Sequence, residues 1–223
     1  MPQRTFVDVL CRVAGPRPAV SGPDAPTLDY VSFCNAADAV GAALVVRGVR
    51  PGDRVAASFP DGVAYLAAFA GTALARAAFV PLIDDEDVSE RLGRVPPRMI
   101  LAAESAAPDL HDSARAASIP LVTLGFDTRG NALIDGEHVY EAHGARVLPD
   151  DVAFIALDGT AATQAALVEA VEEHSAFSST TVRLASPLST LPGLTAALAV
   201  LGGGGHLVIG NGALTRERVL LGN

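Results

Sequence analysis

Short apolar stretches alternate with helical stretches along most of the chain, and this alternation restricts the fold more than any other sequence feature. The clearest strand candidate is 152–157, a run of six apolar residues. Such a continuous run is typical of a strand buried on both faces, as in a parallel sheet. By contrast, 35–47 places Ala37, Val40 and Leu44 at helical spacing. The alternation predicts an α/β fold, with helices flanking a mostly parallel sheet.

The remaining expected elements continue this pattern. Strands are predicted at 19–20, 28–31, 54–59, 78–82, 98–102, 121–124, 181–184 and 206–209, and helices over 6–13, 64–77, 110–117, 162–173 and 194–201, with another helix starting in the acidic run 84–87. Asp61 is the expected N-cap of the helix at 64–77. A surface loop or small β excursion is expected at 125–149. We therefore treat 1–223 as one domain; an internal seam would lie near 144–150.

The chain contains no lysine, because all sixteen of its basic residues are arginines. This excludes a phosphate-loop lysine, a Schiff-base lysine and a kinase-type lysine within the sequence. The 25 acidic residues give a formal net charge of −9. Because nucleic-acid binding requires clustered positive charge and these arginines are scattered, we expect no nucleic-acid partner.

The cysteines, histidines and N-terminus give no sign of secretion or metal binding. Cys11 and Cys34 form no CxxC motif, which favours a reducing compartment. The first residues contain no apolar signal-peptide core, and no apolar run reaches the length of a membrane span. The five histidines show no HxH or HExxH spacing. We therefore expect a cytoplasmic protein without a membrane span or a metal site.

One loop is placed to bind an anion. Asp158, Gly159 and Thr160 directly follow the apolar run 152–157 and are expected to open the helix at 162–173. Glycine permits a sharp turn there, and the N–H groups at a helix start can bind phosphate. Alternatively, the segment is a plain strand-to-helix turn with Thr160 as the N-cap. The glycine run 202–205 lies between a helix and a strand instead, and it is expected to be a helix terminator.

Two segments read together resemble the opening of adenylate-forming ligases, the superfamily of acyl-CoA synthetases, fatty acyl-AMP ligases and peptide-synthetase adenylation domains. The first is 47–56 (RGVRPGDRVA), which is similar to the family pattern GV-x-x-GD-x-V-A. The second is 77–82 (AAFVPL), which follows one helix later and is similar to GA-x-x-VPL. The resemblance implies the fold of the first N-terminal subdomain of such a ligase.

Two later segments extend the resemblance, but they differ from the family pattern at the residues that would bind phosphate. The segment 149–160 (PDDVAFIALDGT) is similar to the strand that leads into the family's phosphate loop. The segment 187–194 (PLSTLPGL) is similar to P-L-x-H-x-x-G-L but lacks the histidine. Only Gly159 and Thr160 match the family's phosphate loop, and Asp158 stands where the family has its first serine. The later glycine and lysine of that loop are replaced by alanine or glutamine within 162–166. His174 lies three residues too late for the family's T-H element.

This departure leaves three functions open. The chain is expected to be a truncated, catalytically degenerate member that acts as an interaction or regulatory module in acyl or polyketide metabolism, without enzymatic activity. Alternatively, it is an enzyme or ligand-binding protein with altered chemistry, for which Asp158 and His174 are the one acid–imidazole pair within reach. The third alternative is one half of a split ATP-dependent acid ligase. No cofactor is expected; ATP or an acyl-adenylate would bind only if 158–160 still holds phosphate.

The resemblance also suggests a partner. A first subdomain alone would expose the apolar surface on which the next subdomain packs, and large apolar patches rarely stay bare. We therefore expect a homodimer, or a complex with a full-length ligase, a carrier protein or an acyl-chain enzyme. The expected contact face lies near the helix at 191–201 and the last strand.

Overall fold

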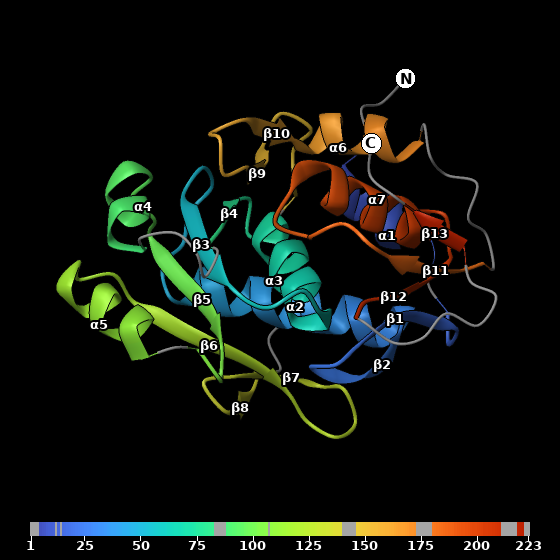
Figure 1. Ribbon diagram of the computed structural model, residues 1–223, viewed down its shortest axis with the longest axis horizontal. Coiled ribbons are helices and arrows are strands. Elements are labelled where there is room, and N and C mark those ends of the chain that lie inside the picture. Colours follow the sequence, from blue (N-terminus) through green and yellow to red (C-terminus); the bar gives the residue numbers. More distant parts are fainter. Residues whose placement is uncertain are drawn as a thin grey trace.

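Two sheets organise the molecule, and helices lie between and around them (Figure 1). The computed structural model describes residues 5–11, 13, 15–82, 88–106, 108–139, 146–172, 180–210 and 218–220. The larger sheet has the strand order β10 (Ala161–Thr163), β9 (Val152–Ile155), β4 (Ala78–Pro81), β3 (Arg54–Ser58), β5 (Met99–Ala103), β6 (Leu121–Phe126), β7 (Ala132–Ile134) and β8 (Glu137–His138). The smaller sheet has the order β13 (Arg218–Leu220), β11 (Thr181–Leu184), β12 (His206–Val208), β1 (Pro18–Gly22) and β2 (Ala25–Asp29).

Most neighbouring strands are parallel, so the predicted α/β fold is confirmed. In the larger sheet β9, β4, β3, β5 and β6 run parallel, and antiparallel strands flank them on both sides. In the smaller sheet only β2 runs against its neighbour. The antiparallel strands β7 and β8 are the small β excursion expected within 125–149. Elements before and after 144–150 share both sheets, because β9 and β10 join the larger sheet and β1 and β2 join the smaller one.

Seven helices are described: α1 (Phe6–Cys11), α2 (Tyr30–Val46), α3 (Val63–Leu74), α4 (Val88–Arg94), α5 (Pro108–Ala116), α6 (Gln164–Glu172) and α7 (Leu191–Gly202). The expected helix start at 84–87 lies outside the described residues. Helices α2 and α3 contact strands of both sheets and therefore join them. A Cβ at Gly71 would lie 2.5 Å from the Cβ of Val40, so glycine is what allows α3 to approach α2 this closely.

The centre of the core is aromatic, although the chain has few aromatic residues. The ring of Phe79 on β4 lies 5.1 Å from the ring of Tyr65, 5.7 Å from that of Phe69 and 6.3 Å from that of Phe154, measured between centroids. All four side chains are almost fully buried. They connect α3 with two neighbouring strands of the larger sheet and contribute much of its packing energy.

The connection that enters β3 follows the family pattern closely. Gly48 and Gly52 have φ angles of +88° and +85°, a backbone region that residues with a Cβ adopt at a cost. Gly48 ends α2 as the expected C′ residue: its N–H donates to Val45, and that of Val49 donates to Leu44. The glycine of GA-x-x-VPL is replaced by Arg76, which also has a positive φ of 59°. The backbone at this position has a left-handed conformation, and an arginine adopts it in place of a glycine.

The predicted N-cap of α3 is wrong. Asp61 does not cap this helix; its Oδ1 accepts a hydrogen bond of 3.0 Å from the N–H of Leu188. The carboxylate that caps α3 belongs to Asp24, in the turn between β1 and β2, and it accepts from the N–H groups of Val63 and Ala64. A carboxylate from a distant turn therefore satisfies the helix start, and the two sheets are joined there by hydrogen bonds.

The predicted place of an exposed apolar face is also wrong. In α7 the side chains of Leu194, Leu198 and Leu201 are no more than 1% exposed, because α1, α6, β11 and β12 pack around the helix. Among the residues whose burial is described, the exposed large hydrophobic residues lie elsewhere, at Val31, Val46, Leu148 and Val152. Among the described helices, none has both the length and the apolar character needed to cross a bilayer.

Candidate functional site

The turn after β9 is the site that the sequence singled out, and the structure corrects its surroundings. Asp158, Gly159 and Thr160 do follow a strand of the parallel sheet. They do not open a helix: the chain turns back at once into the antiparallel strand β10, and α6 begins only at Gln164. Thr160 is therefore not an N-cap. Thr163 holds that place, since its Oγ1 accepts from the N–H of Ala166.

The N–H groups of this β9–β10 turn are bonded within the turn itself. Gly159, with φ of +88°, donates its N–H to the carbonyl of Ala156 at 3.0 Å. Thr160 donates its N–H to Oδ1 of Asp158 at 2.8 Å, and the carbonyl of Thr160 accepts from Ala156 at 2.8 Å. A phosphate cradle needs N–H groups that point at the anion. Here the carboxylate of Asp158 accepts one of those N–H groups.

The hydrogen bonds also set the charge of the turn. The pKa of Asp158 is lowered, first by the hydrogen bond from the N–H of Thr160, then by that from its side chain, with a smaller contribution from the positive charge of Arg91. Asp158 is therefore ionised at neutral pH. An approaching phosphate meets a negative charge at the exposed surface of the turn.

The side chain of a buried arginine binds the backbone at the start of the turn, and the sequence analysis did not identify this residue. Arg91 lies on α4 and is 2% exposed. Its Nη1 donates to the carbonyl of Leu157 at 2.7 Å, and its Nη2 donates to the carbonyl of Ala156 at 3.2 Å. A charged side chain is rarely buried unless it is well bonded, so these contacts fix the position of α4 relative to the turn.

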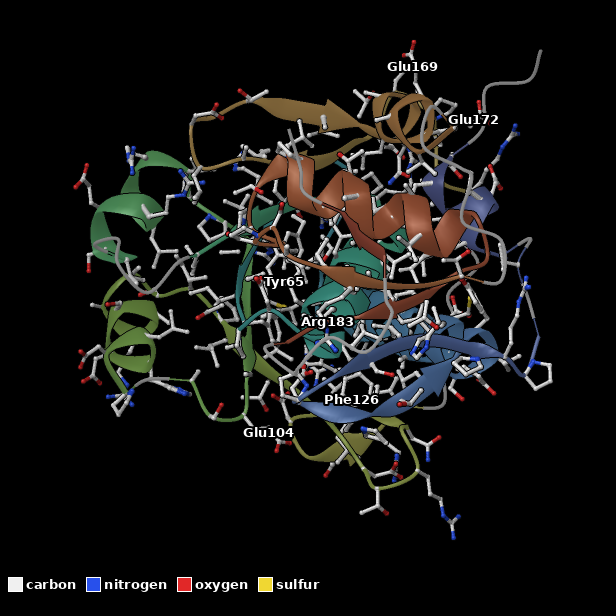
Figure 2. All side chains as sticks on the ribbon, turned by 45° about the vertical axis from the view of Figure 1, so that its right-hand side comes forward. Tyr65, Glu104, Phe126, Glu169, Glu172 and Arg183 are labelled. Carbon is white, nitrogen blue, oxygen red and sulfur yellow. The ribbon has the colours of Figure 1, made fainter. Side chains whose placement is uncertain are left out.

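A cavity lies at the carboxyl end of the smaller sheet. Its volume is about 540 Å³, and it is lined by Pro23, Asp61, Leu184, Ala185, Ser186, Ile209 and Gly210. Apart from Asp61, which lies between β3 and α3, these residues follow or end β1, β11 and β12, so the cavity lies where parallel α/β sheets usually bind ligands. Arg183, labelled in Figure 2, donates to the carbonyl of Gly210 at its edge. Burial raises the pKa of Asp61, and the N–H of Leu188 partly offsets this.

The remaining sequence candidates lie outside the described residues or have a structural place in them. His174, the imidazole proposed to pair with Asp158, lies outside the described residues. Over the described ranges, no group of three or more His, Cys, Asp and Glu side chains could hold a metal ion. The glycine run forms the predicted helix end, with Gly203, Gly204 and Gly205 donating back to α7 carbonyls. Figure 2 shows Glu169 and Glu172 pointing outward from α6, which gives this helix an acidic outer face.

Comparison with known proteins agrees with this geometry. The sequence profile of the AMP-binding enzyme family matches residues 9–157. Among curated proteins, none matches the sequence. Similar solved structures include apo MatB from Rhodopseudomonas palustris, at 19% identity and a TM-score of 0.75, with 93% of this chain and 45% of that chain covered.

Two further structures share the fold at low identity. The complex of VinN with L-aspartate has 21% identity and a TM-score of 0.76, covering 93% of this chain and 57% of VinN. A mutant form of coronafacic acid ligase from Pectobacterium brasiliense has 12% identity and a TM-score of 0.78, covering 93% of this chain and 46% of the ligase. The chain thus spans about half the length of the structures it resembles.

Proposed function

Because this chain belongs to the family of AMP-binding enzymes, we propose that it uses an acyl-CoA synthetase-like scaffold as an interaction or regulatory module and does not adenylate an acid itself. The observation that carries the proposal is the internally bonded β9–β10 turn. Its Thr160 N–H is bonded to the carboxylate of Asp158, where a phosphate loop would leave it for the nucleotide.

The composition of the chain supports the same proposal. Phosphoryl chemistry depends on cations and donors that stabilise the charge of the transferred group. The 223 residues contain no lysine, and Arg91, which is bonded to the turn, directs two of its donors at backbone carbonyls. Neither a lysine nor the guanidinium donors of Arg91 that bond the backbone are therefore offered to a nucleotide at this turn.

The proposal that the chain has a protein partner rests on its resemblance to the family and not on a particular surface contact. We propose a second copy of the chain or a protein of acyl or polyketide metabolism, namely a full-length ligase, a carrier protein or an acyl-chain enzyme, encountered in the cytoplasm. The acidic outer face of α6 and the net charge of −9 favour a partner whose contact surface is basic. Raising the salt concentration is expected to weaken such a complex.

Calorimetric titration tests the proposal directly. The purified chain is titrated with ATP-Mg and with a non-hydrolysable acyl-adenylate analogue. We expect no saturable heat at millimolar concentrations of either compound. Micromolar binding of ATP-Mg would contradict the proposal and favour one half of a split acid ligase. The proposed oligomer is measured separately by sedimentation of the chain alone and together with a candidate ligase or carrier protein.

The cavity at the carboxyl end of the smaller sheet favours a second function, the binding of a small ligand. Asp61 is the carboxyl group among its lining residues, and a carboxylate there can accept a hydrogen bond from a ligand or pair with a positive charge on it. Native mass spectrometry of the purified chain would reveal a retained molecule. Asp61→Asn is expected to release it, whereas Asp158→Asn, in the other turn, is expected to leave it bound.

A further inference from the structure

We infer that Asp158 and Arg91 form an intramolecular lock, in which a carboxylate tethered to the β9–β10 turn takes the position of an external oxyanion and a buried guanidinium holds the turn in that closed form. This inference rests on the proposed function only in assuming that the turn does not bind nucleotide. It adds the physical cause of that behaviour, and it adds a residue, Arg91, that lies far from the turn in sequence.

The first part of the lock is the carboxylate. Oδ1 of Asp158 lies 2.8 Å from the N of Thr160, which is the distance and the donor that an anion bound to the turn would use. Because the carboxylate is covalently attached two residues away, its local concentration is far above that of any free anion. A dissolved phosphate would have to displace it and would then face its charge.

The second part is the guanidinium of Arg91. It donates to two successive carbonyls, those of Ala156 and Leu157, which are the last residues before the turn. These bonds fix the direction of the peptide groups leading into Asp158. The remaining bond across the turn, from the N–H of Ala156 to the carbonyl of Thr160, closes the loop from the other side. The turn therefore cannot widen around a larger anion without breaking one of these hydrogen bonds.

The third observation is a comparison within the molecule. The turn between β6 and β7 contains Asp127, whose Oδ1 accepts from the N–H groups of Arg129 and Asn131 at 2.8 and 2.9 Å. Like Asp158, it is a carboxylate in a hairpin turn of the same sheet that accepts the N–H two residues further along the chain. Its other hydrogen bonds come from the backbone and side-chain amides of Asn131, whereas the β9–β10 turn is held by the buried Arg91. Asp127 is therefore the matched control for Asp158.

The test is phosphate binding by variants of the full chain. Inorganic phosphate is titrated into wild type, Asp158→Ser, Asp127→Ser and the double variant Asp158→Ser with Arg91→Met, and binding is followed by calorimetry and by the width of the phosphorus NMR line. We expect Asp158→Ser to bind phosphate at least about tenfold more tightly than wild type. Asp127→Ser, which removes the same charge, should match wild type, and adding Arg91→Met to Asp158→Ser should increase the gain further, because the guanidinium no longer holds the turn closed.

The outcomes separate this inference from the proposed function. Equal phosphate binding by Asp158→Ser and Asp127→Ser would overturn the lock, and so would a double variant that binds phosphate no more tightly than Asp158→Ser alone. If the double variant does not fold, Arg91→Lys in the Asp158→Ser background replaces it, and tighter phosphate binding than in Asp158→Ser is again expected because lysine cannot bond both carbonyls in the same plane. Tight ATP-Mg binding by wild type would defeat the proposed function and the lock together, whereas a failed phosphate gain with no ATP binding defeats the lock alone.

Discussion

Two connections of the larger sheet differ in how much of the family pattern they keep. The loop 48–53 enters β3 at the amino end of the sheet and keeps the glycines at the two positions where φ is positive. The turn 156–160 follows β9 at the carboxyl end and keeps only Gly159 with positive φ, while Asp158 bonds the N–H of Thr160. The first connection meets a backbone requirement, and the second would meet a ligand. The family pattern is therefore kept where the backbone requires it, and it is changed at Asp158, where the proposed function places the loss of a phosphate site.

The largest effect is expected in the scaffold. Phe79→Ala removes a fully buried ring that contacts three other aromatic rings, so the free energy of unfolding should fall by about 3–5 kcal/mol. Urea denaturation followed by circular dichroism measures this loss. Phe79→Leu is the control, because it keeps most of the apolar volume and should lose less. Equal stability of Phe79→Ala and wild type would mean that the aromatic core does not hold the sheet to α3.

A smaller loss is expected where scaffold and turn meet. Arg91→Met keeps most of the apolar stem but removes the guanidinium donors from the carbonyls of Leu157 and Ala156, of which Ala156 keeps the bond from the N–H of Gly159. An unsatisfied buried polar group costs about 1–3 kcal/mol. The same denaturation experiment measures it, and hydrogen exchange should show faster exchange in β9 and β10 than in β3. If exchange rises equally in all three strands, Arg91 supports the whole sheet and not the turn.

The next effect is expected at Arg76, which replaces the glycine of the family pattern before β4. Arg76 has a positive φ, and its Nε and Nη2 bond both carboxylate oxygens of Asp151 at 2.8 and 3.0 Å. Arg76→Ala loses this pair and keeps the strained backbone, whereas Arg76→Gly loses the pair and relieves the strain. The glycine variant should therefore melt about 2–4 °C above the alanine variant. The reverse order would show that backbone geometry does not govern this position.

The pair formed by Arg76 and Asp151 also predicts a dependence on pH. Burial raises the pKa of Asp151, but the hydrogen bonds from Arg76 and from the N–H of Leu148 outweigh it, and the net pKa is lowered. A carboxyl group whose pKa is lower in the folded state stabilises it above the unfolded pKa of about 4, and this contribution is lost as the pH falls further. Wild type should therefore lose more stability than Arg76→Gly between pH 5 and about 2, as measured by thermal denaturation.

The sequence predicted what local patterns determine and missed what distant contacts determine. Gly48 and the apolar strands could be placed because helix ends and buried runs have local signals. The helix predicted at 162–173 includes the last two residues of β10, because alanine favours helices, and only pairing with β9 makes this segment extended. Arg91 could not be predicted as buried, since arginine is seldom buried and its two acceptors lie on another strand.

The smallest effect is expected at Asp158 itself, and it tests whether the turn is independent of the scaffold. Asp158→Asn retains an oxygen that can accept from the N–H of Thr160 but removes the charge, so at pH 7 the melting temperature should change by less than about 2 °C. The NMR signal of the Thr160 amide should move in wild type as the pH falls below about 4, because the pKa of Asp158 is lowered and its carboxylate then takes up a proton. In Asp158→Asn that movement should disappear, while the amide of Asn131, bonded to Asp127, should still move. A large loss of stability in Asp158→Asn would mean that the carboxylate supports the fold, and the turn would then have been kept for packing just as the loop 48–53 was.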